Sequence, residues 1–183
     1  MNRGKLIFIT GGARSGKSSF AEKIAIESSR EVTYIATAEP LDSEMKYRIQ
    51  KHKDARPSHW KTYEEPCKVN QLIRCLGRDN RVIIMDCLTL LTSNLLLRKE
   101  DKVQDETWQK EILNQITDLA ESAYKVRSKV IIVSNEVGMG LVPDNVLGRS
   151  FRDVLGKANY IFAGMADEVI LMVSGIPLKI KGK

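Results

Sequence analysis

The chain alternates short apolar runs with longer segments in which apolar and polar residues are mixed. The runs are rich in β-branched residues and favour strands at residues 5–10, 32–37, 82–86, 129–134 and 168–173. Because most of their positions are apolar, they are typical of parallel strands that are buried on both faces of a sheet. Residues 178–181 alternate between apolar and basic side chains, which predicts a final edge strand.

The segments between these runs predict helices at residues 17–29, 42–55, 67–76, 88–98, 106–126 and 145–165, with 59–66 irregular or extended. Strands that alternate with helices predict an α/β fold, in which a mostly parallel sheet is flanked by helices. We find no linker, internal repeat or low-complexity tract, so we expect residues 1–183 to form a single domain. Ligands of such sheets bind beyond the carboxyl ends of the strands, where Gly11, Thr37, Asp86 and Asn135 fall.

The junction between the first strand and the first helix carries the pattern G-x-x-x-x-G-K-[ST] of a phosphate-binding P-loop. Its glycines let backbone N–H groups approach phosphate oxygens, and the helix adds the positive end of its dipole. We expect Lys17 to act as a catalytic residue on the β- and γ-phosphates, and the Ser18 hydroxyl to ligate Mg²⁺. The motif predicts a P-loop NTPase (RecA-like) fold whose catalytic domain binds a nucleoside triphosphate through Gly11, Gly12, Ala13, Arg14, Ser15, Gly16, Lys17 and Ser18.

Asp86 ends the apolar run at residues 82–86, where P-loop proteins place the acid that holds Mg²⁺ beside the phosphates. We interpret Asp86 as a metal residue that acts together with Ser18. The alternative is that Asp86 caps the helix that begins at Leu88.

His52 lies on the helix predicted at residues 42–55, on a face that it shares with Met45, Arg48, Ile49 and Arg56. The neighbouring cations favour a neutral imidazole, which is a good nucleophile toward phosphorus. From the pattern alone, a histidine at the edge of the core is the favoured interpretation.

Two further segments are open to more than one interpretation. His59, next to Trp60, is interpreted as a packing residue. The segment from Asn135 to Gly140 follows a buried strand, where it could position substrate, orient water, supply a base or simply form a loop.

Charge, cysteine spacing and hydropathy limit which partners, metals and cellular locations fit this chain. The net charge is +6 over 183 residues and the basic residues are spread along the chain, which suits anionic substrates such as nucleotides. We find no motif that reads nucleic acid, so we expect no nucleic acid partner. Cys67, Cys75 and Cys87 form no C-x-x-C pair, which argues against disulfides and zinc. We find no apolar stretch of membrane-spanning length and no signal peptide, so we expect a cytoplasmic protein.

Motifs along the whole chain resemble the bifunctional adenosylcobinamide kinase / adenosylcobinamide-phosphate guanylyltransferase family of cobalamin biosynthesis. Many families share the P-loop, but the order of the other motifs is more specific. The matching pieces are Thr10 to Ser18; Tyr34 to Ala38; Arg48-Ile49 with His52, Arg56-Pro57 and Trp60; Asp86 to Thr89; Asn94 to Leu96; Ser134 to Gly140; Gly148-Arg149 with Phe151 to Asp153; and Ser174 to Pro177. In one departure, Asn159-Tyr160 stands where the family pattern has Asn-Gln, so a substrate contact by that glutamine is not carried over.

The resemblance implies two reactions. The first phosphorylates the aminopropanol hydroxyl of adenosylcobinamide with a nucleoside triphosphate, GTP or ATP. The second transfers GMP from GTP onto the resulting adenosylcobinamide phosphate through a guanylyl-histidine, which the resemblance places at His52. It also implies a homo-oligomer, namely a trimer. The nucleotide contacts that it implies outside the P-loop are Ala36, Thr37, Ala38, Lys53, Asp54, Ala55, Arg56, Glu64 and Asp86.

Two other functions use fewer of these residues. A stand-alone P-loop small-molecule kinase or ATPase would use Lys17, Ser18 and Asp86 and would leave His52 as a structural residue. A nucleic-acid-dependent ATPase of similar fold is the third interpretation. The nucleotide that leaves a covalent label on the protein distinguishes these functions.

Overall fold

The computed structural model describes residues 3–29, 31–54, 56–79 and 81–182, apart from the side chain of Arg48. The strands are β1 (Leu6–Gly11), β2 (Val32–Ala36), β3 (Lys61–Glu64), β4 (Val82–Asp86), β5 (Lys129–Val133), β6 (Glu168–Val173) and β7 (Ile176–Lys181). The helices are α1 (Lys17–Ser28), α2 (Ser43–Asp54), α3 (Val69–Leu76), α4 (Leu88–Leu97), α5 (Glu106–Lys125) and α6 (Val146–Met165), with a short 3₁₀ helix, η1 (Glu100–Lys102). The predicted strands and helices are confirmed, with small shifts at their ends.

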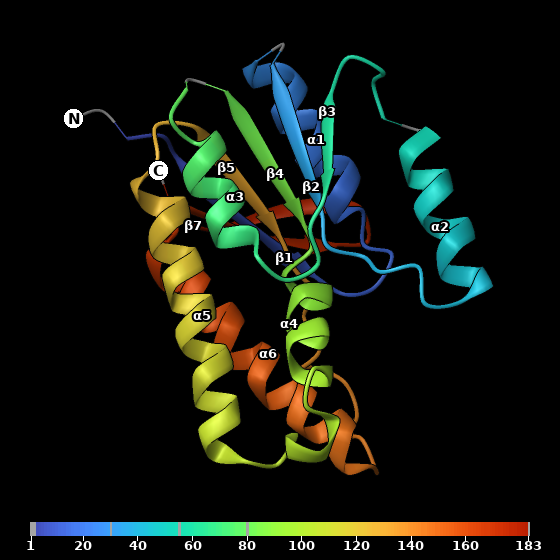
Figure 1. The fold of residues 1–183 in the computed structure, drawn as a ribbon. Coiled ribbons are helices and arrows are strands. Elements are labelled where there is room, and N and C mark those ends of the chain that lie inside the picture. The colour runs from blue at the N-terminus through green and yellow to red at the C-terminus, as the bar shows by residue number, and fades with distance from the viewer. Residues whose placement is uncertain (1–2, 30, 55, 80, 183) are drawn as a thin grey trace.

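The strands form one sheet in the order β3-β2-β4-β5-β1-β6-β7 (Figure 1). All neighbouring strands are parallel except β7, which pairs antiparallel with β6. The mostly parallel sheet that the sequence predicts is therefore confirmed. The segment predicted as irregular or extended contains β3, which pairs with β2 and forms one edge of the sheet.

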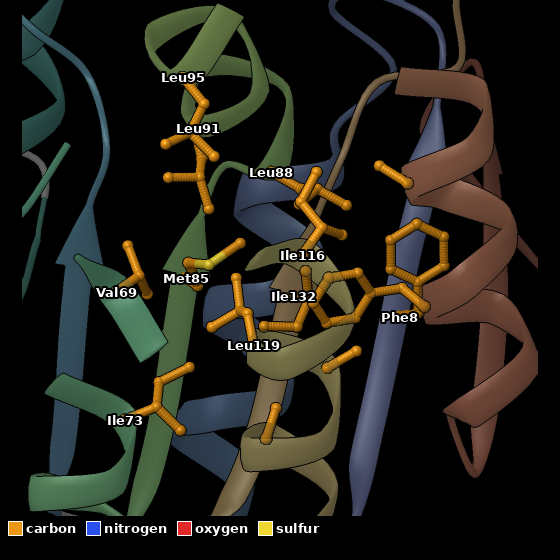
Figure 2. Packing of buried hydrophobic residues seen from close by; sticks show 14 of the residues in the cluster. Phe8, Val69, Ile73, Met85, Leu88, Leu91, Leu95, Ile116, Leu119 and Ile132 are labelled. Atoms are coloured by element: carbon orange, nitrogen blue, oxygen red, sulfur yellow. The ribbon is translucent and has the colours of Figure 1, made fainter. Parts of the chain in front are cut away.

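The two faces of the sheet explain why the strands are apolar at successive positions. Leu6 and Phe8 of β1 face a large cluster with α3, α4, α5 and α6, whereas Ile7 and Ile9 face α1 on the other side. Figure 2 shows part of the large cluster, in which Phe8 and Ile132 of the sheet lie near Ile116 of α5. Successive side chains of a strand point to opposite faces of the sheet. A sheet that is covered on both faces therefore requires apolar residues at both the odd and the even positions of its strands.

Helix α2 stands apart from these layers. It lies beyond the edge of the sheet, past β3 (Figure 1). None of its side chains that the structure describes is buried. Its N-terminus is closed by Asp42, whose carboxylate accepts a hydrogen bond from the Met45 amide at 2.7 Å. Across the described residues, no helix is both long and apolar enough to cross a membrane.

Candidate active site

The P-loop connects the end of β1 to the start of α1, as the motif predicts. Gly11 has φ 150°, and a Cβ atom there would lie 2.4 Å from the carbonyl oxygen of Met172, so only glycine fits. Gly16 precedes α1 with φ 88°, and Arg14 also has a left-handed backbone, with φ 57°. A turn of this kind at a helix N-terminus is an anion-binding site.

The P-loop contains buried polar groups that a phosphate would satisfy. The Lys17 ammonium donates a hydrogen bond to the carbonyl oxygen of Gly12 at 2.6 Å, and only 8% of the residue is exposed. Burial lowers the pKa of Lys17, which shows that its positive charge is poorly solvated. The hydroxyls of Thr10 and Ser15 are buried without a hydrogen-bond partner among the described residues. Anionic oxygens are the partners that such donors lack.

Asp86 stands at the carboxyl end of β4, as predicted, and its Oδ2 accepts a hydrogen bond from the Tyr34 hydroxyl at 2.7 Å. It does not cap α4, because the cap is Cys87, whose Sγ accepts from the amide of Leu90. Asp86 and Ser18 line the same cavity. No three His, Cys, Asp or Glu residues of the described chain gather as a metal site. A cation held here would therefore take part of its ligands from phosphate and water, as Mg²⁺ does beside nucleotides.

A cavity of about 270 Å³ joins the P-loop to α2. Its walls include Met45, Ile49 and His52 of α2, together with Ser18 and Asp86. The helix face predicted from the sequence is therefore confirmed for these α2 residues and for Arg56, which also lines the cavity. The side chain of Arg48, predicted on the same face, lies outside the described residues. His52 is exposed, so the interpretation as a core-edge histidine is wrong.

Arg56 is a half-buried cation of this cavity. Its guanidinium carbon lies 3.6 Å from the centre of the Tyr34 ring, and its Nε and Nη1 atoms are buried with no partner among the described residues. Tyr34 in turn stacks on Trp60, with ring centres 6.5 Å apart. His59, in contrast, is exposed, so its interpretation as a packing residue is wrong. A stacked guanidinium with free N–H groups is suited to hold phosphate oxygens.

The other predicted nucleotide contacts divide into three groups. Ala36, Ala38 and Lys53 line the cavity, and Lys53 forms an ion pair with the exposed Glu64 of β3. Thr37 is fully buried and does not line the cavity. Its hydroxyl accepts a hydrogen bond from the amide of Cys87 and donates one to the Cys87 carbonyl, both at 2.7 Å. The exposed Asp54 carboxylate accepts from Gln50 at 2.7 Å. Ala55 lies outside the described residues.

Sequence reasoning missed Tyr34, which lines the first cavity, and Glu22, which lies nearby on α1. Tyr34 bridges Arg56 and Asp86, as described above, and burial raises the pKa of its hydroxyl. Glu22 lies one turn after Ser18 on α1, and burial raises the pKa of its carboxyl, which lies in the electrostatic field of Arg56, Asp86 and His52. The i, i+4 spacing from Ser18 was the available signal for Glu22.

The segment after β5 separates this cavity from a second one. Asn135 lines the first cavity, while Glu136 and Met139 line the second, which measures about 340 Å³. The other walls of the second cavity are Gly12 to Ser15 of the P-loop and Leu171 to Ser174 at the end of β6. The P-loop therefore has a cavity on each side.

Buried hydrogen bonds hold this segment in place. The Asn159 amide donates to the carbonyl of Asn135 at 3.0 Å and accepts from the Ser134 hydroxyl at 2.7 Å. The amide of Asn135 donates to the Thr89 hydroxyl at 2.7 Å. Tyr160, where the sequence departs from the family pattern, is 82% exposed and lines neither cavity. The departure therefore leaves this network intact.

The fold and the P-loop together define a P-loop protein of RecA-like fold. Residues 7–180 match the cobinamide kinase / cobinamide phosphate guanyltransferase family, and the chain belongs to this family. It is 44% identical to the bifunctional adenosylcobalamin biosynthesis protein CobU of Salmonella typhimurium, over 96% of this chain and 99% of that protein. It is 39% identical to the bifunctional adenosylcobalamin biosynthesis protein CobP of Pseudomonas aeruginosa, over 96% of both chains.

Solved structures with the same fold are distant in sequence. The ATPase EscN of the enteropathogenic E. coli type III secretion system matches 93% of this chain and 43% of its own, with a TM-score of 0.59 and 13% identity. The flagellar accessory protein FlaH from Methanocaldococcus jannaschii matches 100% of this chain and 80% of its own, with a TM-score of 0.50 and 16% identity. At these identities, the likeness shows the fold alone.

Proposed function

We propose that this enzyme phosphorylates adenosylcobinamide and then transfers GMP from GTP to adenosylcobinamide phosphate, with His52 as the guanylylated nucleophile. The observation that carries the proposal is the first cavity, in which Ser18 and Asp86 lie together with His52 and Arg56. A kinase alone needs the phosphate side of this cavity. A nucleotidyl transfer through histidine also needs an accessible imidazole beside the nucleotide, and the position of the exposed His52 in the cavity wall supports this.

In the first reaction, the hydroxyl oxygen of the aminopropanol group forms a bond to the γ-phosphorus. The bond between that phosphorus and its bridging oxygen breaks, the nucleoside diphosphate leaves and the hydroxyl proton is released. In this proposal Lys17 neutralises the charge that develops on the β- and γ-phosphates, and the hydrogen bond that keeps its ammonium in the P-loop supports this role. The P-loop backbone orients the triphosphate for in-line attack.

The residues present fit a Mg²⁺ ion that accompanies the nucleotide. The Ser18 hydroxyl and the Asp86 carboxylate would hold it, because Asp86 uses one oxygen for Tyr34 and keeps the other available. When bound, Mg²⁺ neutralises charge on the β- and γ-phosphates. Tyr34 fixes the orientation of the Asp86 carboxylate through this part-buried hydrogen bond.

In the second reaction, an imidazole nitrogen of His52 attacks the α-phosphorus of GTP. The bond to the bridging oxygen breaks, pyrophosphate leaves and GMP remains on the histidine. A phosphate oxygen of adenosylcobinamide phosphate then attacks the same phosphorus, and the P–N bond breaks to release the imidazole and adenosylcobinamide-GDP. Lys53 and Arg56 line the cavity beside His52, where they can stabilise the departing pyrophosphate.

The test is incubation of the wild type and His52→Ala with α-labelled GTP or ATP. We expect GTP to leave a label on the wild type that is labile to acid and stable to base, as a P–N bond is, and we expect His52→Ala to take up none while it still phosphorylates adenosylcobinamide. His59→Ala is the matched control and should label normally, because His59 lies outside the first cavity. Label on His52→Ala would exclude His52 as the nucleophile. An unlabelled wild type that still acts as a kinase would favour the stand-alone kinase.

The same proposal covers assembly and location. We propose a trimer, following the family resemblance, and the exposed side chains of Ile176, Leu178 and Ile180 along β7 support a subunit contact. Light scattering coupled to size exclusion chromatography tests the trimer.

We also propose that the enzyme lies in the cytoplasm, which agrees with the free thiols of Cys67, Cys75 and Cys87.

A further inference from the structure

The second cavity and the nucleotide site are both lined by the P-loop. Gly12 to Ser15 line it from one side of the P-loop, while Ser18 lines the first cavity from the other. The segment after β5 also serves both, with Asn135 in the first cavity and Glu136 in the second. A phosphate held in the P-loop would therefore border both cavities. A kinase needs this arrangement, because its acceptor hydroxyl must reach the γ-phosphate from a site that the nucleotide does not fill.

The linings of the two cavities differ in chemistry. The first carries His52, Lys53 and Arg56, which suits a triphosphate. The second is walled by Leu171, Met172, Val173 and Met139, and its charged side chains are Arg14 and Glu136, one of each sign. A lining that is mostly apolar, with a few polar groups, is typical of small-molecule and cofactor sites.

The mouth of the second cavity offers further apolar contact. Met139 is 82% exposed and Val173 is 52% exposed, and the adjoining Leu141 is almost fully exposed. Large apolar side chains that remain exposed around a hollow mark a surface for a ligand or a partner. A ligand that uses them must extend beyond the hollow itself.

The walls of the second cavity are fixed to the P-loop by backbone hydrogen bonds. The Gly175 amide, just after β6, donates to the carbonyl of Ser15 at 3.1 Å, and the Glu136 amide donates to the carbonyl of Gly11 at 2.9 Å. The Glu136 carboxylate accepts from the Gly138 amide at 2.6 Å and so shapes the loop that carries Met139. In addition, the Ser15 hydroxyl is buried without a partner among the described residues and lines this cavity. The walls of the site are therefore preformed.

We propose that the second cavity binds the corrin ring of the acceptor, and that the ring stays there during both transfers. The inference rests on the proposed function. The ring carries methyl groups and neutral amide side chains, which match an apolar wall with few charges, and its aminopropanol group is flexible enough to reach over the P-loop. After phosphorylation, the new phosphate occupies the position of the γ-phosphate, from which it can attack GMP on His52 in the adjoining cavity. One acceptor site then serves both reactions.

The test compares Val173→Trp, which fills the cavity from an exposed strand position, with Met139→Gln, which removes apolar contact from the loop. The matched control is Ile26→Trp, on an exposed apolar residue of α1 that lines neither cavity. For Val173→Trp we expect the KM for adenosylcobinamide and the KM for adenosylcobinamide phosphate both to rise about tenfold, equivalent to about 1.4 kcal/mol. Met139→Gln should give smaller rises in the same direction. Equilibrium dialysis against cobinamide, followed by its own absorbance, should show the same order.

The nucleotide reactions provide the internal reference. The KM for GTP and the rate at which GTP labels His52 without corrinoid should equal those of the wild type, as should the mass by light scattering. Three results for Val173→Trp would overturn the common site. They are unchanged binding of the corrinoid, a loss of GTP labelling as large as the loss of corrinoid binding, and a KM that rises for only one of the two acceptors. Loss of assembly with an unchanged KM would assign the surface to a subunit contact and also overturn it. A wild type that phosphorylates no adenosylcobinamide would instead contradict the proposed function.

Discussion

The amino ends and the carboxyl ends of the parallel strands differ in how their charged side chains are paired. At the amino ends, Arg3 donates two hydrogen bonds to the carboxylate of Asp167, at 2.6 and 2.8 Å, and Lys5 pairs with Glu168 at 2.6 Å. At the carboxyl ends, Lys17 has only a carbonyl as its partner, and Arg56 keeps buried N–H groups unpaired among the described residues. Most charges at the amino ends are thus paired, whereas the cations beside the P-loop are mostly not, although Lys53 pairs with Glu64 at the end of β3.

This difference in pairing indicates that the charges at the amino ends stabilise the fold, whereas those at the carboxyl ends serve binding. Paired charges at the amino ends hold the start of β1 to the start of β6, since Asp167 also accepts from the Leu6 amide at 2.8 Å. Unpaired donors at the carboxyl ends cost folding free energy, and this cost is offset when an anion binds. Arg81 is a partial exception at the amino ends, because its Nε is buried without a partner while another nitrogen pairs with Asp79. Substitutions at the two ends should therefore affect different measurements.

The largest effect is expected from Lys17→Ala. The kinase rate should fall by about a thousandfold or more, because the charge on the transferred phosphate loses its buried cation. Thermal stability should not fall, since the lost ammonium was poorly solvated in the folded state. Lys23→Ala, on the exposed side of α1, is the control. Near-normal phosphorylation of adenosylcobinamide by Lys17→Ala would exclude this loop as the triphosphate site.

Asp86→Asn should have the next largest effect. The amide oxygen can still accept from Tyr34, so folding should persist, but the anionic oxygen available to Mg²⁺ is lost. We expect activity to fall about ten- to a hundredfold and the Mg²⁺ concentration for half-maximal rate to rise. Titration with Mg²⁺ at saturating nucleotide measures this. A half-maximal concentration equal to that of the wild type would show that Asp86 is not a metal residue.

Arg56→Lys should have a smaller effect on the same end of the strands. Lysine keeps the charge but loses the planar stack on Tyr34 and the two donor nitrogens that have no partner among the described residues. We expect the KM for GTP to rise about tenfold with little change in thermal stability. Lys51→Arg, on the exposed surface of α2, should leave the KM unchanged. If Arg56→Lys unfolds the protein without changing nucleotide affinity, Arg56 is structural.

The smallest effect on activity is expected from Asp167→Asn. Its hydrogen bonds to Arg3 hold the pKa of Asp167 at about 2, below its ordinary value of 3.8. Because the folded-state pKa is depressed, the carboxylate stabilises the fold above about pH 3.8, and this stability is lost as the pH falls toward 2.

We therefore expect Asp167→Asn to lower the free energy of unfolding by about 1 to 2 kcal/mol at pH 7, after allowance for solvent screening. The difference from the wild type should shrink as the pH falls through that range, and activity at 25 °C should not change. Denaturant unfolding at several pH values measures it, with the exposed Asp101→Asn as the control. A difference that is independent of pH would show that the ion pair is not the cause.

Sequence reasoning predicted the features that depend on neighbours along the chain. The apolar runs specified β1, β4 and β6, and the motif specified the P-loop. The i, i+3 spacing placed Ile49 on the same helix face as His52, and both line the first cavity. These inferences succeeded because strand and helix periods fix which side chains share a face before any tertiary contact forms.

Tertiary structure alone decided how distant segments meet. The short exposed strand β3 carries little pattern of its own, and pairing with β2 is what makes it a strand. Tyr34 of β2, Asp86 of β4 and Arg56 after α2 form one cluster, although no local spacing relates them. The first cavity likewise arises where α1, β2, α2 and β4 meet, and the second where the P-loop, the end of β6 and the segment after β5 converge. Such contacts depend on strand order, which is set by the packing of the whole sheet and not by the period of any one segment.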